Sequence, residues 1–260
     1  MKIGTAAPSV TELNAVKHHF IHHKSVDESY NVGMFEKDAI NCLEALFKTH
    51  DKVIMVGGSG LYINAVTKGL DYFPEVDPGI RDDLNLQLKN KGLKSLQEEL
   101  KKLDPDSYNS IEIENPHRVI RALEICRGSG KPYSSFLNQK KTKRNFKKLS
   151  IGLTAERYII YNRIDQRVEE MMQLGLLNEV RNLIPKQHLN ALNTVGYKEL
   201  FKYLNNEWPL DFAISELKKN SRRFAKRQIT WFKKDSSIHW FDYKTELETI
   251  IKKIEDLIPE

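Results

Sequence analysis

Apolar and polar positions follow one another along the chain in blocks that are typical of an α/β fold. Residues 53–56 form an apolar run that ends in a small-residue turn at 57–60 (GGSG), and residues 61–67 continue with helical spacing. A buried strand, a glycine turn and a helix make up one βα step of a parallel sheet. Two further core strands are predicted at 149–153 and 238–241.

Helical patterns surround these strands. Residues 31–50 have the apolar spacing of a helix, and a long helix is predicted from about residue 155, with an interruption near Gly175. Residues 72–148 show leucines at helical spacing and no strand pattern, after prolines at 74 and 78. We therefore predict an α/β core at 1–73 and 149–260, with a helical insertion domain at 74–148.

Composition narrows the class of protein. Of 260 residues, 40% are apolar and 29% are charged, which excludes general disorder. No run of 18 apolar residues predicts a membrane span, and the first residues lack the apolar segment of a secretory signal. The two cysteines, Cys42 and Cys126, are too far apart in sequence for a CxxC pair, so neither a disulfide framework nor a cysteine zinc site is expected. We expect a cytoplasmic protein.

Positive charge is concentrated in two segments. Residues 115–148 contain ten Lys/Arg and one acid, and residues 216–234 contain eight Lys/Arg and one acid, whereas the whole chain carries only +6. The remainder of the chain is therefore acidic. Basic segments on such a background indicate a polyanionic partner. The alternative is a set of solvated helix faces, but acids for pairing four residues apart are nearly absent from both segments.

Two candidate phosphate sites stand out. The turn made by Gly57, Gly58, Ser59 and Gly60 ends a predicted strand and opens a helix, where backbone N–H groups and the Ser59 hydroxyl suit a phosphate. It fits neither GxGxxG nor the Walker pattern, so a plain tight turn is the alternative.

A pair of arginines is the second candidate. Arg163 and Arg167 lie four positions apart and share a helix face, where two guanidinium groups match a pyrophosphate. Pairing with Asp165, Glu169 or Glu170 is the alternative, and without further context it is the favoured interpretation.

Two further clusters have weaker interpretations. His18, His19, His22 and His23 have helical spacing, but neither an intervening Glu nor a nearby Cys supports a metal site, so we expect a structural role. In residues 222–233, helical spacing aligns the basic side chains into a ridge that suits phosphates. Gln228 and Thr230 could reach a base edge, and the aromatic residues are expected to face the core.

Seven short segments of the chain together resemble motifs of the tRNA dimethylallyltransferase (tRNA isopentenyltransferase) family. They occur in the family's order and span nearly the whole chain. The matching segments are residues 3–8 (IGTAAP), 18–20 (HHF), 57–62 (GGSGLY), 115–124 (NPHRVIRALE), 161–168 (YNRIDQRV), 194–198 (TVGYK) and 226–231 (KRQITW). The resemblance implies a P-loop-NTPase-like parallel sheet core in which residues 74–148 form a helical, tRNA-binding insertion.

The resemblance also implies an activity. The family transfers a dimethylallyl group from dimethylallyl diphosphate to the exocyclic amine of adenosine 37 in tRNA, with Mg²⁺. Ser59 would lie in the channel where donor and adenosine meet, lined by Gly57, Gly58 and Gly60. Arg163 and Arg167 would lie near the diphosphate, with no basis for choosing between them. No residue is assigned as a metal ligand.

The implied partner is the anticodon stem-loop of tRNA, bound by a monomer. The residues that would hold it are Arg81, His117, Arg118, Val119, Ile120, Arg121, Thr194, Gly196, Tyr197, Lys198, Lys226, Arg227, Gln228, Thr230, Trp231 and Lys233.

One departure from the family concerns the start of the chain. Family members begin with a strand, a P-loop of the GPTAxGKT type and a DSxQ motif that holds the proposed general base, and Met1 falls just before IGTA. The first βα unit is thus absent from these residues, and we expect the chain as numbered to be inactive alone. A fragment of the enzyme is the favoured interpretation. A catalytically incomplete RNA-binding module is the alternative, and a small-molecule P-loop kinase relative ranks last.

Overall fold

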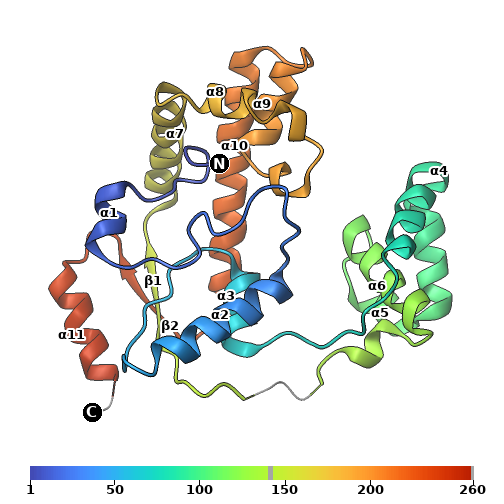
Figure 1. Ribbon diagram of the computed structural model, residues 1–260, viewed down its shortest axis with the longest axis horizontal. Helices are drawn as coiled ribbons and strands as arrows, with labels where there is room; N and C mark the ends of the chain where they lie inside the picture. Colours follow the sequence, from blue (N-terminus) through green and yellow to red (C-terminus); the bar gives the residue numbers. More distant parts are fainter. Residues whose placement is uncertain (140–142, 259–260) are drawn as a thin grey trace. The chain divides into compact units, whose positions relative to one another are not determined.

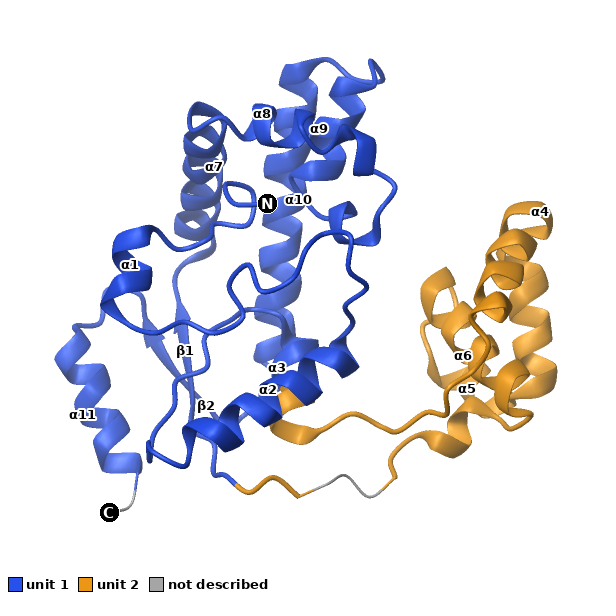
Figure 2. Ribbon diagram, in the orientation of Figure 1, with its two compact units in different colours: residues 1–63, 146–260 blue, residues 64–145 orange. Residues whose placement is uncertain are grey.

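The computed structural model describes residues 1–139 and 143–258 and divides the chain into two compact units (Figure 2). Unit 1 combines residues 1–63 with 146–260, and unit 2 comprises residues 64–145. Lys140 and Lys141, two cations of the first basic segment, lie outside the described residues. The domain boundaries predicted from sequence, at 74 and 148, stay predictions.

Unit 1 contains a small parallel sheet and most of the helices (Figure 1). The strands β1 (Ser150–Thr154) and β2 (Ile238–Asp242) pair in parallel, with Ser150 opposite Ile238 and Thr154 opposite Asp242. Both strands confirm the sequence prediction. The helices are α1 (Val10–Ala15), α2 (Val32–Leu46), α7 (Arg157–Gln173), α8 (Leu176–Arg181), α9 (Tyr197–Leu204), α10 (Leu210–Phe232) and α11 (Leu247–Leu257), with 3-10 turns at Ile184–Lys186 and Asn190–Leu192.

The strand predicted at residues 53–56 is absent from the structure. These residues have no regular secondary structure and pair with no described strand, and Ile54 and Val56 are 88% and 90% exposed. The apolar composition predicted burial, but a strand forms only where a neighbouring backbone accepts and donates its hydrogen bonds. The helix predicted after the turn is present as α3 (Gly60–Lys68), which begins in unit 1 and continues into unit 2.

The core of unit 1 lies among α7, α8, α9 and α10. Gly175, with a φ of 97°, separates α7 from α8 and confirms the predicted interruption. The core side chains come from all four helices and the segment before α9, and they are Val168, Leu176, Val180, Leu192, Tyr197, Leu200, Phe201, Ala213 and Leu217.

Glu179 of α8 ties the start of the chain to this core. Its carboxylate accepts hydrogen bonds from the backbone N–H groups of Lys2 (2.7 Å), Ile3 (2.9 Å) and Gly4 (3.1 Å), and from the Tyr197 hydroxyl at 2.6 Å. Burial raises the pKa of this carboxyl, but the donated hydrogen bonds outweigh burial and hold the pKa below its usual value. Residues 2–4 and the first residue of α9 therefore meet at one side chain.

Unit 2 is helical over its described residues, as predicted. It contains α4 (Pro78–Leu103), α5 (Pro105–Ser110), α6 (Pro116–Ser129) and a 3-10 turn at Tyr133–Phe136, and Gly92, with a φ of 76°, bends α4. Its core is Leu84, Leu96, Leu100, Val119, Ile120, Ala122, Leu123 and Cys126. In the part of the chain that the structure describes, no helix has the length and apolar character needed to cross a membrane.

Candidate nucleic-acid interface and phosphate-binding turn

The turn at 57–60 forms the entry to α3. The Ile63 N–H donates to the Ser59 carbonyl at 3.0 Å, so Ser59 caps the first helical turn, and its side chain is exposed. Backbone N–H groups at the start of a helix lack partners within the helix and favour anions. The turn thus has the donors that a phosphate group requires.

This turn packs directly on α10, whose C-terminal end lies beside the start of α3 (Figure 1). The Gln228 side-chain amide donates to the Gly58 carbonyl at 2.8 Å. A Cβ atom at Gly58 would lie 1.8 Å from the Gln228 Nε2, and one at Gly60 would lie 2.1 Å from the Trp231 Nε1. A side chain at Gly58 would push the flexible Gln228 amide out of its hydrogen bond, whereas one at Gly60 would clash with the rigid Trp231 ring, so the close approach of the turn to α10 depends most on Gly60.

The structure gives Gln228 and Trp231 a contact that sequence did not suggest. Both were predicted to hold tRNA; in the structure Gln228 bonds to the turn and Trp231 packs on it, and Trp231 is still 43% exposed. Contact of either residue with tRNA stays a prediction. Thr230 uses its hydroxyl within the helix, where it donates to the Lys226 carbonyl at 2.9 Å.

A basic ridge runs along the exposed face of α10. Arg223, Lys226, Arg227 and Lys233 are all exposed, and their spacing places them on neighbouring turns of one helix face. Arg222, by contrast, is half-buried and forms an ion pair with Asp165 of α7 at 2.5 Å. The ridge therefore begins at Arg223, with its positive charge directed to solvent.

The two arginines of α7 do not form the expected local ion pairs. Asp165 binds Arg222, and Glu169 binds Lys218, so α10 occupies two of the three acids named as partners of Arg163 and Arg167. The third, Glu170, is exposed and forms no ion pair with either arginine among the described residues.

Both of these arginines are exposed. The Arg163 guanidinium lies 5.6 Å from the Tyr243 ring centre, and no ion pair of Arg163 or Arg167 occurs within residues 1–139 and 143–258. No described hydrogen bond joins them to the turn at 57–60. Their predicted contact with a diphosphate therefore stays a prediction.

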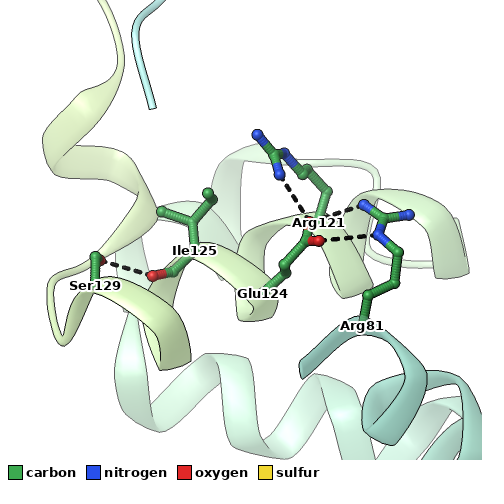
Figure 3. Close-up of polar contacts among 5 residues, drawn as sticks. All are labelled: Arg81, Arg121, Glu124, Ile125 and Ser129. Carbon is green, nitrogen blue, oxygen red and sulfur yellow. Dashed lines mark hydrogen bonds and ion pairs between the residues drawn. The ribbon is translucent and has the colours of Figure 1, made fainter. Parts of the chain in front are cut away.

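In unit 2, Arg81 of α4 and Arg121 of α6 converge on Glu124 of α6 (Figure 3). Arg81 donates from Nε and Nη2 to the two carboxylate oxygens at 2.9 and 2.8 Å, and Arg121 donates from Nη1 at 2.7 Å. The hydrogen bond from Arg81 holds the Glu124 pKa below its usual value against the effect of burial. Sequence reasoning missed Glu124, although it is the single acid among ten cations in residues 115–148.

Burial corrects part of the predicted tRNA-binding segment on α6. Val119 and Ile120 are 0% and 2% exposed in the core of unit 2, so their side chains cannot contact an RNA. They anchor the helix that presents His117 and Arg118, which are exposed. Only the polar residues of this segment remain candidates for contact.

The predicted tRNA-binding residues at 194–198 also divide into buried and exposed ones. Tyr197 is fully buried and donates to Glu179, and Gly196 is buried with a φ of 101°. Neither side chain can therefore reach an RNA, because one is core and the other is absent. Thr194 and Lys198 are exposed and remain candidates.

The histidine cluster bonds to the main chain. Ring nitrogens of His18, His22 and His23 lie 2.8, 3.0 and 3.1 Å from backbone carbonyl oxygens. Among the residues described, no three or more His, Cys, Asp or Glu side chains gather into a group that could hold a metal ion. The structural role expected for the four histidines stays a prediction.

Comparison with known proteins places the chain in a family. Residues 1–235 match the family model described as IPP transferase. The chain belongs to this family. A tRNA dimethylallyltransferase of Christiangramia forsetii is 56% identical over 258 residues, which cover 99% of this chain and 85% of that protein. The tRNA dimethylallyltransferase 1 of Bacteroides thetaiotaomicron is 46% identical over 250 residues, covering 96% and 81% of the two chains.

Solved structures agree with the family and the fold. The full-length tRNA isopentenylpyrophosphate transferase of Bacillus halodurans is 34% identical, with a TM-score of 0.68 over 99% of this chain and 82% of that chain. A eukaryotic dimethylallyltransferase acting on tRNA has a TM-score of 0.79 over 99% of this chain and 70% of its own, at 23% identity, which shows the fold alone. The predicted α/β fold of this IPP transferase family member is therefore confirmed.

Proposed function

We propose that this chain acts in tRNA prenylation, by transfer of a dimethylallyl group from dimethylallyl diphosphate to the exocyclic amine of adenosine 37. In this reaction the amine nitrogen bonds to the first carbon of the dimethylallyl group, the carbon–oxygen bond to the diphosphate breaks, and the nitrogen loses a proton to a base. The site must therefore bind an anionic leaving group beside an RNA.

The contact between the turn at 57–60 and α10 is the observation that carries this proposal. The same helix holds the turn through Gln228 and presents Lys226 and Arg227 to solvent. An anion-binding turn and a phosphate-tracking ridge thus share one rigid element, which suits a reaction between a diphosphate and an RNA base.

The donor's diphosphate would be bound by the start of α3, with the exposed Ser59 hydroxyl as an additional donor. Mg²⁺ commonly binds through substrate phosphates and one or two carboxylates. Since the described residues form no cluster of three metal-ligating side chains, we propose that Mg²⁺ enters with the diphosphate and neutralises its charge. Arg163 or Arg167 would assist there.

The proposed partner is the anticodon stem-loop, bound by a monomer in the cytoplasm. The cations proposed to contact it lie on the exposed face of α10 and on α4 and α6. They are Arg81, Arg118, Arg121, Lys226, Arg227 and Lys233, together with Lys198 in the first turn of α9.

Binding at two salt concentrations tests the RNA half of the proposal. The chain should bind an anticodon stem-loop that contains the adenosine more tightly than one with a scrambled loop, and the affinity should fall as salt rises. Equal affinity for both RNAs would contradict the proposed function. Sedimentation of the same samples checks the monomer.

Calorimetry with dimethylallyl diphosphate tests the donor half. Ser59→Ala should weaken binding of the diphosphate by about tenfold, because one charge-assisted hydrogen bond is lost, and should leave stem-loop affinity unchanged. Ser236→Ala, at another exposed serine of unit 1, is the matched control. Equal loss of diphosphate and RNA binding in Ser59→Ala would contradict the role given to Ser59.

A further inference from the structure

One carboxylate in unit 2 serves two guanidinium groups. Glu124 is 8% exposed at its side chain, whereas Arg81 and Arg121 are 44% and 41% exposed (Figure 3). The carboxylate is thus covered while both cations still reach solvent. Arg81 uses Nε and Nη2 and Arg121 uses Nη1 for this contact, so further N–H donors of each fork point elsewhere.

The charge of this cluster differs from that of an ordinary ion pair. Elsewhere in unit 2, Glu99 binds a single guanidinium, that of Arg127, through two bonds of 2.7 Å. That pair is neutral. Glu124 balances only one of its two arginines, so the Arg81–Glu124–Arg121 cluster keeps a net positive charge at the surface.

A second restraint acts on Arg121. Its guanidinium lies 5.2 Å from the centre of the Phe73 ring, and Phe73 stacks on Tyr133 with a centroid distance of 4.9 Å and an interplanar angle of 10°. Arg121 is therefore fixed by a carboxylate on one side and by an aromatic face on another. Fixing an arginine before it binds lowers the entropy lost when it meets a phosphate.

We propose that Glu124 is a positioning residue, which holds Arg81 and Arg121 as a fixed pair for phosphate oxygens of the bound tRNA. The arginines contact the RNA, and Glu124 acts through them. This inference rests on the proposed function, since it assigns one part of the RNA surface. It concerns residues of unit 2 only.

The direction in which Glu124→Gln changes the affinity for the stem-loop distinguishes positioning from simple electrostatics. Glu124→Gln removes a negative charge close to a polyanion, so a purely electrostatic surface would bind the stem-loop more tightly. If Glu124 positions the arginines, the same change releases them and should weaken binding about five- to tenfold. Unchanged or tighter binding by Glu124→Gln would overturn the proposal.

Glu99→Gln is the matched control. It removes the same charge from the same unit and also releases one arginine, Arg127, which has no proposed RNA contact. Its affinity should stay within about twofold of wild type or rise slightly. A loss as large as that of Glu124→Gln would show that any released arginine in unit 2 weakens binding, which would overturn the specific role of Glu124.

A second pair of variants keeps the test decisive if Glu124→Gln does not fold. Arg81→Lys and Arg121→Lys retain the charge but lose the fork that matches a carboxylate and a phosphate, so each should weaken binding several-fold, while Arg127→Lys should not. Wild-type affinity in both lysine variants would overturn the inference. Failure of the proposed function itself looks different, because wild type would then not distinguish the stem-loop from the scrambled RNA.

Discussion

Two glutamates, one in each unit, collect several hydrogen bonds and use them for opposite purposes. Glu179 in unit 1 accepts from neutral donors, the three N–H groups of residues 2–4 and the Tyr197 hydroxyl. Glu124 in unit 2 accepts from two charged guanidinium groups. Neutral donors leave the charge on the carboxylate and tie chain segments together. The two charged donors of Glu124 leave one positive charge unbalanced, and the carboxylate holds both guanidinium groups in a fixed orientation.

The same contrast extends to protonation. Burial, together with the hydrogen bond to Glu179, raises the pKa of the Tyr197 hydroxyl, so this hydroxyl stays a donor at neutral pH. Glu124 has a lowered pKa chiefly because of Arg81. We therefore expect changes at Glu179 to affect stability, and changes at Glu124 to affect RNA binding more than stability.

The largest expected effect is the loss of stability in Glu179→Ala. This variant leaves the N–H groups of Lys2, Ile3 and Gly4 and the buried Tyr197 hydroxyl without their acceptor. The free energy of unfolding should fall by about 2 kcal/mol, measured by urea denaturation. Glu170→Ala, at an exposed acid on α7, is the control and should stay within about 0.5 kcal/mol of wild type. Equal stability of the two variants would contradict the structural role of Glu179.

A methyl group at Gly4 should disturb the contact between residues 2–4 and Tyr197 by a steric clash. A Cβ atom there would lie 2.5 Å from the Tyr197 hydroxyl oxygen and 2.7 Å from its ring, which is fixed in the core. We expect Gly4→Ala to lower the free energy of unfolding by about 1–2 kcal/mol. In Gly57→Ala, the new methyl group would meet no atom within 4 Å, so this control should remain close to wild-type stability. Since Gly→Ala by itself restricts the unfolded chain and favours the folded state, a similar loss in both variants would contradict the clash with Tyr197 as the cause.

The lowered pKa of Glu179 predicts a pH dependence of stability. Its carboxylate is charged in the folded protein below the usual pKa of 4.5, so its contribution is complete above about pH 4.5 and is lost as the pH falls through the lowered value. The stability difference between wild type and Glu179→Gln should therefore shrink on acidification from pH 6 towards pH 3. A difference that grows over this range would contradict the assigned contacts.

Local pattern in the sequence predicted the elements but not their long-range partners. The strands β1 and β2, the interruption at Gly175 and the helical unit 2 all follow from periodicity within a short window. The prediction of a strand at 53–56 was wrong because an apolar run does not show whether a neighbouring strand is present to pair with it. The ion-pair partner of Asp165 is Arg222, which lies 57 positions away in the sequence, and not the nearby Arg163 or Arg167 that the sequence suggested.

The candidate site shows the same limit. The motif at 57–60 and the motif at 226–231 were found separately, but the contact between Gln228 and Gly58 spans 170 positions. Likewise, the sequence showed Glu124 as an isolated acid at the end of the segment 115–124, with no sign that Arg81 reaches it across 43 positions. Motifs therefore predicted which residues matter, while the structure alone showed which of them act together.

The smallest expected effect concerns an arginine that lacks a carboxylate to position it. Arg227 is exposed on the ridge of α10, 5.8 Å from the Phe224 ring centre. Arg227→Ala should weaken stem-loop binding modestly and lower the slope of log affinity against log salt by about one. Arg157→Ala, which removes the same charge outside the ridge, should keep the wild-type slope.

Lysine variants compare the two kinds of arginine directly. Because no carboxylate fixes the guanidinium fork of Arg227, Arg227→Lys should bind the stem-loop as tightly as wild type, whereas Arg81→Lys should not. Equal behaviour of the two lysine variants would remove the distinction between positioned and unpositioned arginines.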